Sequence, residues 1–251
     1  MNLAIDHPLA FAAFLIFLAC FFIARFFLQH GAQFSLRPIA GFAALKQLLA
    51  QSIETNLPIH LSLGIAGIGA RATAETTAAL QALEYLADGG ALGATPPLVT
   101  CADPTVLPVA QDILRRASER RGYASEFDDT RARWIAPEPF AYAAGTMQFV
   151  NAQALTANVM LGEFGDEFLL LGEPGAHKNL PQIGGTSTLR VLPFFQTTMT
   201  HPLIGEEIFA AGAYLGNRPA HHASLAAQDL ARWLIVSGVI TAIALKSLGW
   251  I

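Results

Sequence analysis

The residues best suited to chemistry lie in a glycine-rich turn near the start of the predicted α/β domain. Gly64, Gly67 and Gly69 separate an apolar run, residues 58–63, from a predicted helix that opens near Thr73. Glycine lets backbone N–H groups approach an anion at the amino end of a helix, so the turn is a candidate ligand-binding site. Its spacing matches neither the dinucleotide fingerprint nor a P-loop, and no lysine follows it. Nucleotide binding and a plain structural turn therefore both remain open.

Three further polar residues stand where the predicted fold would hold a ligand. Asp103, Glu138 and His201 each directly precede a proline at a predicted helix start. Ligands of open α/β sheets bind beyond the carboxyl ends of the strands, so these residues and the three glycines form the candidate ligand-binding set. The alternative is that each of the three is a helix cap, which stabilises by about 1 kcal/mol. No catalytic residue is indicated.

Acidic residues also gather around a predicted β-hairpin. They are Glu163, Asp166, Glu167 and Glu173. Paired carboxylates can share a proton or bind a divalent cation, but turns also collect acidic residues for solvation. The adjacent His221 and His222 point apart on a helix, so we predict no metal-ligand set. Signatures of serine hydrolases, zinc proteases and kinases are absent, and the sequence indicates no particular cofactor.

Successive strand–helix steps are predicted to position these residues. Strands at residues 58–63, 97–101 and 131–136 each lead into a helix. This alternation favours a mostly parallel sheet with right-handed crossovers, that is, a Rossmann-like α/β fold.

The second half of the predicted domain follows a different pattern. Residues 158–164 and 167–171 are predicted to pair as a β-hairpin that turns at Gly165 and Asp166. The remaining elements are expected as a long loop over residues 172–188, a strand over 189–195 and a helix over 200–214.

Apolar segments at both ends of the chain predict two transmembrane helices. The chain is 53% hydrophobic and 14% charged, and its mean hydropathy of +0.43 is high for a soluble domain. About 20 residues span a hydrocarbon core of roughly 30 Å, a length that residues 8–28 and 230–248 provide. A cleaved signal peptide is the alternative for the first segment, and a buried core helix for the second. The predicted organisation is a transmembrane helix at 1–30, an amphipathic linker helix at 31–57, the α/β domain at 58–229 and a transmembrane helix at 230–251.

The charge distribution predicts the orientation in the membrane. Lys246 lies on the outer side of the second span, and the other basic residues near the spans lie on the domain side: Arg25, Arg37, Lys46, Arg218 and Arg232. The positive-inside rule then puts the α/β domain in the cytoplasm and both termini outside a bacterial cell membrane. The net charge of -4 is unclustered, which excludes a nucleic-acid partner. The lipid bilayer is the expected partner.

Short segments along the chain resemble a known family. They are Ile59–Gly64, Asp103–Thr105, Ala110–Asp112, Gly162–Gly165 and Leu203–Glu207. In these segments the chain resembles a group of bacterial membrane proteins known only as a domain of unknown function. The resemblance implies an anchor at each end of the chain and transfers no catalytic residue.

The predicted function is a membrane-anchored scaffold or assembly protein. Gly238 and Ala242 are spaced so that two membrane helices can approach closely, and we expect self-association into a homo-oligomer or a membrane complex. The alternatives are a membrane-tethered ligand- or nucleotide-binding regulatory domain and a metal-assisted hydrolase that uses the acidic residues of the hairpin. Enzymatic activity is not the expectation.

Overall fold

The computed structural model divides the chain into two units. It describes residues 8–30, 37–69, 71–122, 124, 127–216 and 219–247. The α/β unit is Pro38–Gly216, and the terminal unit combines Met1–Arg37 with Asn217–Ile251. Three features of the sequence prediction lie outside the described residues: the first residues of the linker, Asn217 with Arg218, and the last four residues with Trp250.

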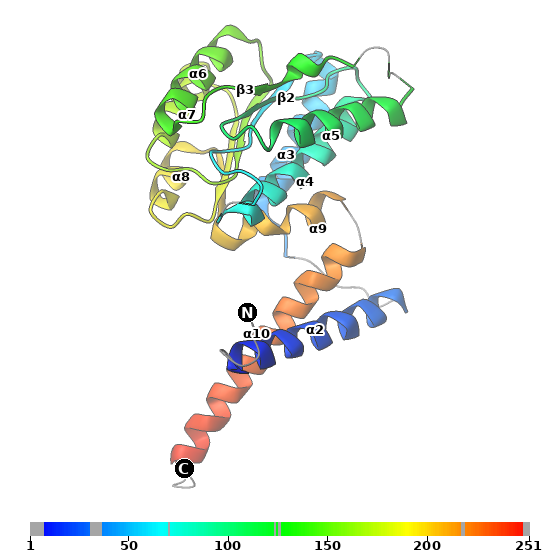
Figure 1. Ribbon diagram of the computed structural model, residues 1–251, viewed down its shortest axis with the longest axis vertical. Coiled ribbons are helices and arrows are strands. Elements are labelled where there is room, and N and C mark those ends of the chain that lie inside the picture. Colours follow the sequence, from blue (N-terminus) through cyan, green and yellow to red (C-terminus); the bar gives the residue numbers. More distant parts are fainter. Residues whose placement is uncertain are drawn as a thin grey trace. The chain divides into compact units, whose positions relative to one another are not determined.

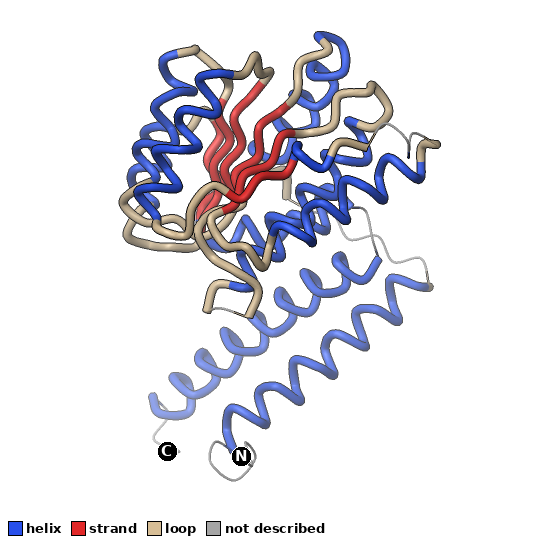
Figure 2. The backbone as a smooth tube through the Cα atoms, turned by 45° about the horizontal axis from the view of Figure 1, so that its top comes forward, coloured by secondary structure: helices blue, strands red, loops and turns tan. Residues whose placement is uncertain are grey.

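Six parallel strands form the sheet of the α/β unit, and they lie side by side in Figure 2. They are β1 (Ile59–Ser62), β2 (Leu98–Cys101), β3 (Ala132–Trp134), β4 (Ala157–Leu161), β5 (Gln182–Thr186) and β6 (His201–Ile204). The spatial order is β3-β2-β1-β4-β5-β6, and every neighbouring pair is parallel. The predicted parallel α/β sheet is therefore confirmed. The order reverses between β1 and β4, which makes their carboxyl ends the topological switch point where ligands bind in such sheets.

Helices cover both faces of the sheet (Figure 1). One face carries α6 (Pro139–Ala152), α7 (Phe168–His177) and α8 (Leu192–Thr198). The other face carries α3 (Ala40–Thr55), α4 (Thr73–Gly90), α5 (Leu107–Arg120) and α9 (Ala211–Gly216). Because both faces are covered, the polar residues of the four inner strands, β1, β2, β4 and β5, are buried along with the apolar ones.

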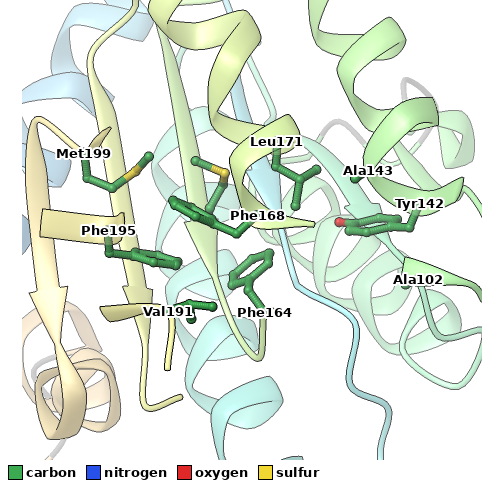
Figure 3. Packing of buried hydrophobic residues seen from close by; sticks show 10 residues of the cluster. Ala102, Tyr142, Ala143, Phe164, Phe168, Leu171, Val191, Phe195 and Met199 are labelled. Carbon is green, nitrogen blue, oxygen red and sulfur yellow. The ribbon is translucent and has the colours of Figure 1, made fainter. Parts of the chain in front are cut away.

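The core on the α6–α8 face is rich in aromatic and sulfur-containing side chains (Figure 3). Phe168 of α7 and Phe195 of α8 stack with ring centroids 3.8 Å apart, and Phe164 lies 5.9 Å from Phe195. Met160 and Met199 fill the space around these rings. Burial of each such side chain stabilises by roughly 1.5–3 kcal/mol, so this cluster holds α7 and α8 on the sheet.

The predicted β-hairpin is wrong. Residues 157–161 do form β4, but β4 pairs with β1 and β5, and the chain then turns into α7. The turn is held by Glu167, whose Oε1 accepts a hydrogen bond from the Gly165 backbone N–H at 2.7 Å. Phe168 and Leu171 both face the core from one side of α7, which the three-residue spacing of a helix allows and a strand does not.

The elements predicted after the hairpin are also wrong. The expected loop over residues 172–188 contains the end of α7 and the buried strand β5. Gly184 and Gly185 made this segment resemble a loop in the sequence. Packing requires Gly184, because a Cβ there would crowd Met199 and Phe195. The expected strand over 189–195 is largely α8, and the expected helix from residue 200 begins as β6 and continues as η3 (Gly205–Ala210) and α9.

The terminal unit consists of two apolar helices that pack against each other, α2 (Pro8–Gln29) and α10 (Pro219–Ser247). Among the described residues, Ala220–Ser247 is long and apolar enough to cross a membrane, while α2 contributes a shorter apolar stretch, Phe14–Phe27. One candidate span is thus found, and the second stays a prediction. His221 and His222 lie in the first turns of α10.

Candidate functional site

The loops after β1 and β4 contact each other directly at the topological switch point. The Ile65 backbone N–H donates to the Glu163 carbonyl oxygen at 3.0 Å. Gly64 has a φ of +79°, and a Cβ at this position would clash with that same carbonyl oxygen. Gly162 likewise leaves no room for a Cβ against the Leu63 carbonyl. These two glycines therefore permit one loop to lie against the other, and the crevice that holds the cofactor in dinucleotide-binding folds is occupied by the chain's own backbone.

The rest of the glycine turn also uses its donors within the protein. The Ile68 N–H donates to Thr105 Oγ1 at 3.0 Å, and the Gly69 N–H donates to Thr73 Oγ1 at 2.9 Å. Gly67 lies against the carboxylate of Asp103, which a Cβ would overlap. A loop whose N–H groups are bonded internally and which adjoins a carboxylate is poorly suited to a phosphate.

The other candidate residues lie apart from one another. Asp103 Oδ1 accepts from the Thr105 N–H at 2.8 Å, so it caps the turn after β2, while α5 begins only at Leu107. Glu138 follows β3 and caps α6, accepting from the Ala141 N–H at 2.7 Å. His201 is the first residue of β6, which puts it at the amino edge of the sheet, opposite the other five. The structure therefore brings Gly64, Gly67 and Asp103 into one neighbourhood, with Gly69 in the same turn.

Two of the four acidic residues of the predicted hairpin do meet, and a third carboxylate joins them. Glu163 and Glu167 follow β4, and Glu75 projects from the first turn of α4. The buried Glu75 accepts hydrogen bonds from Thr186 Oγ1 at 3.3 Å and from Ser187 Oγ. The remaining two carboxylates have partners elsewhere: Asp166 forms an ion pair with Arg190, and Glu173 Oε1 lies 3.4 Å from His177 Nε2.

Electrostatics single out Glu163 within this carboxylate cluster of Glu75, Glu163 and Glu167. Partial burial raises the pKa of Glu163, and the negative charges of Glu75 and Glu167 raise it further, against the opposing effect of Arg71. A carboxyl whose ionised form is disfavoured in this way is suited to accept a cationic group. Within the described part of the chain, no three His, Cys, Asp or Glu residues are arranged to hold a metal ion.

A buried polar network runs across the α6 face of the sheet, and the sequence analysis missed it. His60 Nδ1 lies 2.7 Å from Asn158 Oδ1, and His60 Nε2 lies 3.0 Å from Thr100 Oγ1. Tyr142 of α6 continues the network, with its hydroxyl 3.1 Å from Thr100 Oγ1 and 2.7 Å from Ser62 Oγ. All five side chains are fully buried, so the network ties α6 to the sheet and is closed to substrates. The alternation of His60 and Ser62 with leucines was the sequence pattern that could have predicted these buried polar side chains.

A groove of about 750 Å³ runs along β3 at the edge of the sheet. Its lining includes Gln111 of α5, Arg133 and Trp134 of β3, and Gln148 and Phe149 of α6. The groove lies two strands away from the switch point, so it is separate from the carboxylate cluster. No motif in the sequence predicted it.

Comparison with known proteins yields one match. A family model described as "Domain of unknown function (DUF6754)" matches residues 3–251. No curated protein and no solved structure matches the chain.

Proposed function

The chain belongs to the DUF6754 family, and we propose that it is a membrane-anchored scaffold whose α/β unit holds partner proteins at the membrane surface. The single observation that carries the proposal is the exposure of α10. Trp233 is 70% exposed, Ile235 67% and Ile243 63%, although all three are large and apolar. A helix with apolar side chains exposed around it is suited to lipid and unsuited to water.

The second anchor in this proposal is α2. Its 22 residues reach about 33 Å at 1.5 Å per residue, which matches a hydrocarbon core of roughly 30 Å. Phe14, Phe22 and Phe26 are each more than half exposed. Two spans would leave both termini on one side and the α/β unit on the other, and the basic residues near the spans favour a cytoplasmic α/β unit in a bacterial cell membrane.

Self-association is the second part of the proposal. A Cβ built on Gly238 of α10 meets no atom within 4 Å, so α2 leaves this position uncovered. Gly238 and Ala242 are spaced as small residues are at close helix crossings in membranes, and a second copy of α10 fits this position.

The closed switch point favours a scaffold over a nucleotide-binding domain. The loop–loop contact between Ile65 and Glu163 occupies the crevice, and the turn's N–H groups at Ile68 and Gly69 already have partners. A groove of about 750 Å³ is open at β3, where a protein partner has access.

The scaffold proposal is tested on the full chain purified in mild detergent. Native mass spectrometry is expected to show an oligomer for the wild type and for Val239→Leu, which alters the neighbouring exposed residue, and a monomer for Gly238→Leu. The wild type and both variants should remain in the membrane fraction after alkaline carbonate extraction. A wild-type monomer at micromolar concentration would refute the assembly role, and release by carbonate would refute the anchor.

The carboxylate cluster supports a second candidate, a regulatory domain that binds a cationic ligand. Glu163 is half-buried beside Glu75 and Glu167, and a cation would relieve the repulsion that raises its pKa. Thermal unfolding of the full chain should then shift upward by several degrees with spermidine near saturation, because a ligand of the native state stabilises it. The shift should vanish in Glu163→Gln, and ATP without metal should give none. Absence of a shift with spermidine would reject this candidate.

A further inference from the structure

We propose that the partner of this scaffold binds as an extended peptide segment with an acidic side chain, which adds a seventh strand to the sheet along β3, between α5 and α6. The inference rests on the proposed scaffold function and names the partner's chemistry.

The hydrogen-bonding pattern of β3 leaves one residue ready to pair. β3 pairs with β2 on one side and ends the strand order on the other. The Ile135 N–H donates to the Cys101 carbonyl of β2 at 3.1 Å. Backbone groups of successive strand residues point to opposite sides, so the N–H and the carbonyl of Trp134 point away from β2. A peptide strand can exchange hydrogen bonds with both.

The walls of the groove leave room for such a strand. Gln111 belongs to α5 on one side of the edge, and Gly145, Gln148 and Phe149 belong to α6 on the other. A Cβ on Gly145 would clash with Ile135, so the glycine lets α6 lie close to the sheet edge. An added strand would lie about 4.8 Å from β3, inside this groove, with its side chains alternating between the two walls.

Arg133 gives the groove a preference in charge. Its Nε donates to the Thr130 carbonyl at 2.9 Å, and its guanidinium lies 5.0 Å from the centroid of the Phe149 ring. No carboxylate among the described residues forms an ion pair with it. Asp128 accepts hydrogen bonds from Thr130 and attracts Arg133 only through a weaker charge interaction, and Asp129 also lines the groove. A guanidinium that is already oriented by two contacts and still lacks an ion pair favours a carboxylate on the incoming strand.

The same charge argues against a second copy of this chain as the occupant. Antiparallel pairing of two β3 strands about a twofold axis would bring Arg133 of one copy near Arg133 of the other, and like charges across a strand pair destabilise it. The short length of β3, three residues, is itself typical of edges that natural proteins protect from self-pairing.

The test uses the full chain in lipid nanodiscs and a displayed library of random twelve-residue peptides. Recovered peptides are synthesised, and their Kd is measured by fluorescence anisotropy. Each backbone N–H of the tightest peptide is then methylated in turn. Strand addition predicts a loss of at least tenfold at the one position whose N–H pairs with the Trp134 carbonyl, and little effect at the positions on either side of it. Losses at a three- or four-residue spacing would indicate a helix in the groove and would overturn the proposal.

Matched variants test the protein side. Trp134→Ala removes the side chain and keeps the N–H, whereas Trp134→Pro removes both, and the lost N–H takes no part in pairing with β2. The peptide should bind Trp134→Pro at least tenfold more weakly than Trp134→Ala, and Arg133→Gln should remove the preference for acidic peptides. Equal affinity for the alanine and proline variants, or failure to recover any peptide, would overturn the proposal.

Failure of this inference is distinguishable from failure of the scaffold function. Trp134→Pro should still form the wild-type oligomer and remain in the membrane, and Gly238→Leu should still bind the peptide. If Trp134→Pro unfolds, the methylation pattern of the peptide decides alone.

Discussion

The imidazole of His60 on β1 and the side-chain amide of Asn158 on β4 bond across the topological switch of the sheet, with Nδ1 and Oδ1 2.7 Å apart. The orientation of the amide is set by its nitrogen, which donates to Gln182 Oε1 at 3.1 Å. Oδ1 of Asn158 is therefore the acceptor, and the proton of the neutral imidazole is on Nδ1. His60 Nε2 then accepts from the Thr100 hydroxyl. The two halves of the sheet are thus joined by side chains as well as by the backbone ladder.

Acidification should weaken the fold through His60. Burial lowers the pKa of His60 from 6.5 to about 4, against the weaker opposing effect of the bond to Asn158. The unfolded chain takes up a proton below pH 6.5 and the folded chain only near pH 4, so stability is complete above pH 6.5 and is lost as the pH falls toward 4. The loss is roughly 3 kcal/mol for this shift. Urea unfolding in mild detergent, followed by tryptophan fluorescence, measures it.

His60→Gln is the control for this pH dependence. The variant should be less stable than the wild type at pH 7.5, because the buried network loses a fitted partner. It should lose the part of the slope between pH 6.5 and 4 that His60 causes. An unchanged slope in His60→Gln would contradict the assignment.

The glycine turn offers a matched pair of substitutions. Gly64→Ala places a Cβ in the carbonyl of Glu163 and also adopts a positive φ, while Gly69→Ala has a φ of +89° and nothing within 4 Å of the new Cβ. We expect about 1–2 kcal/mol of destabilisation for Gly69→Ala from backbone strain, and at least 1–3 kcal/mol more for Gly64→Ala from overpacking. Thermal unfolding of both variants measures the difference. Equal effects would mean that the loop–loop contact is not what requires Gly64.

Removing the charge of Glu163 should stabilise the protein at neutral pH. The pKa of Glu163 is raised by partial burial and by the charges of Glu75 and Glu167, so its ionised form is less favourable in the folded chain than in the unfolded one. Glu163→Gln should therefore unfold at a higher temperature than the wild type at pH 7.5. The advantage should disappear below about pH 4.5, where Glu163 is protonated in both states. Asp166→Asn, at an exposed carboxylate paired with Arg190, serves as the control and should change little.

Orientation in the membrane can be read from a single exposed thiol. Both natural cysteines are buried, and burial, assisted by the charge of Asp103, raises the pKa of Cys101 to about 12. Its thiol should therefore not react with a maleimide while the protein is folded. Leu189→Cys places a thiol at a position that is 80% exposed. If the α/β unit is cytoplasmic, an impermeant maleimide will label this variant only after the cells are permeabilised, and the wild type in neither condition. Labelling in intact cells would reverse the orientation.

The sequence by itself determined the first three strand–helix steps, because each depends on local signals. An apolar run marks β1 and β2, and a proline follows the cap Glu138 at the start of α6. Residues close in the chain supply both the periodicity and the caps, so these elements can be predicted without the fold. The apolar segments that became α2 and α10 were readable for the same reason.

Only the tertiary structure decided the second half of the α/β unit and the grouping of the polar residues. In the sequence alone, the glycines of β5 are typical of a loop. Only the packed structure shows that Met199 and Phe195 occupy the space that a side chain on Gly184 would need. His201 begins β6 and therefore lies at the amino ends of the strands, opposite Asp103, which follows the carboxyl end of β2. The strand order brings Glu75 beside Glu163 although they are far apart in the chain. Which residues meet depends on which strands become neighbours. The strand order is determined by burial of the whole sheet between two layers of helices. This effect is cooperative, so no local sequence pattern contains it.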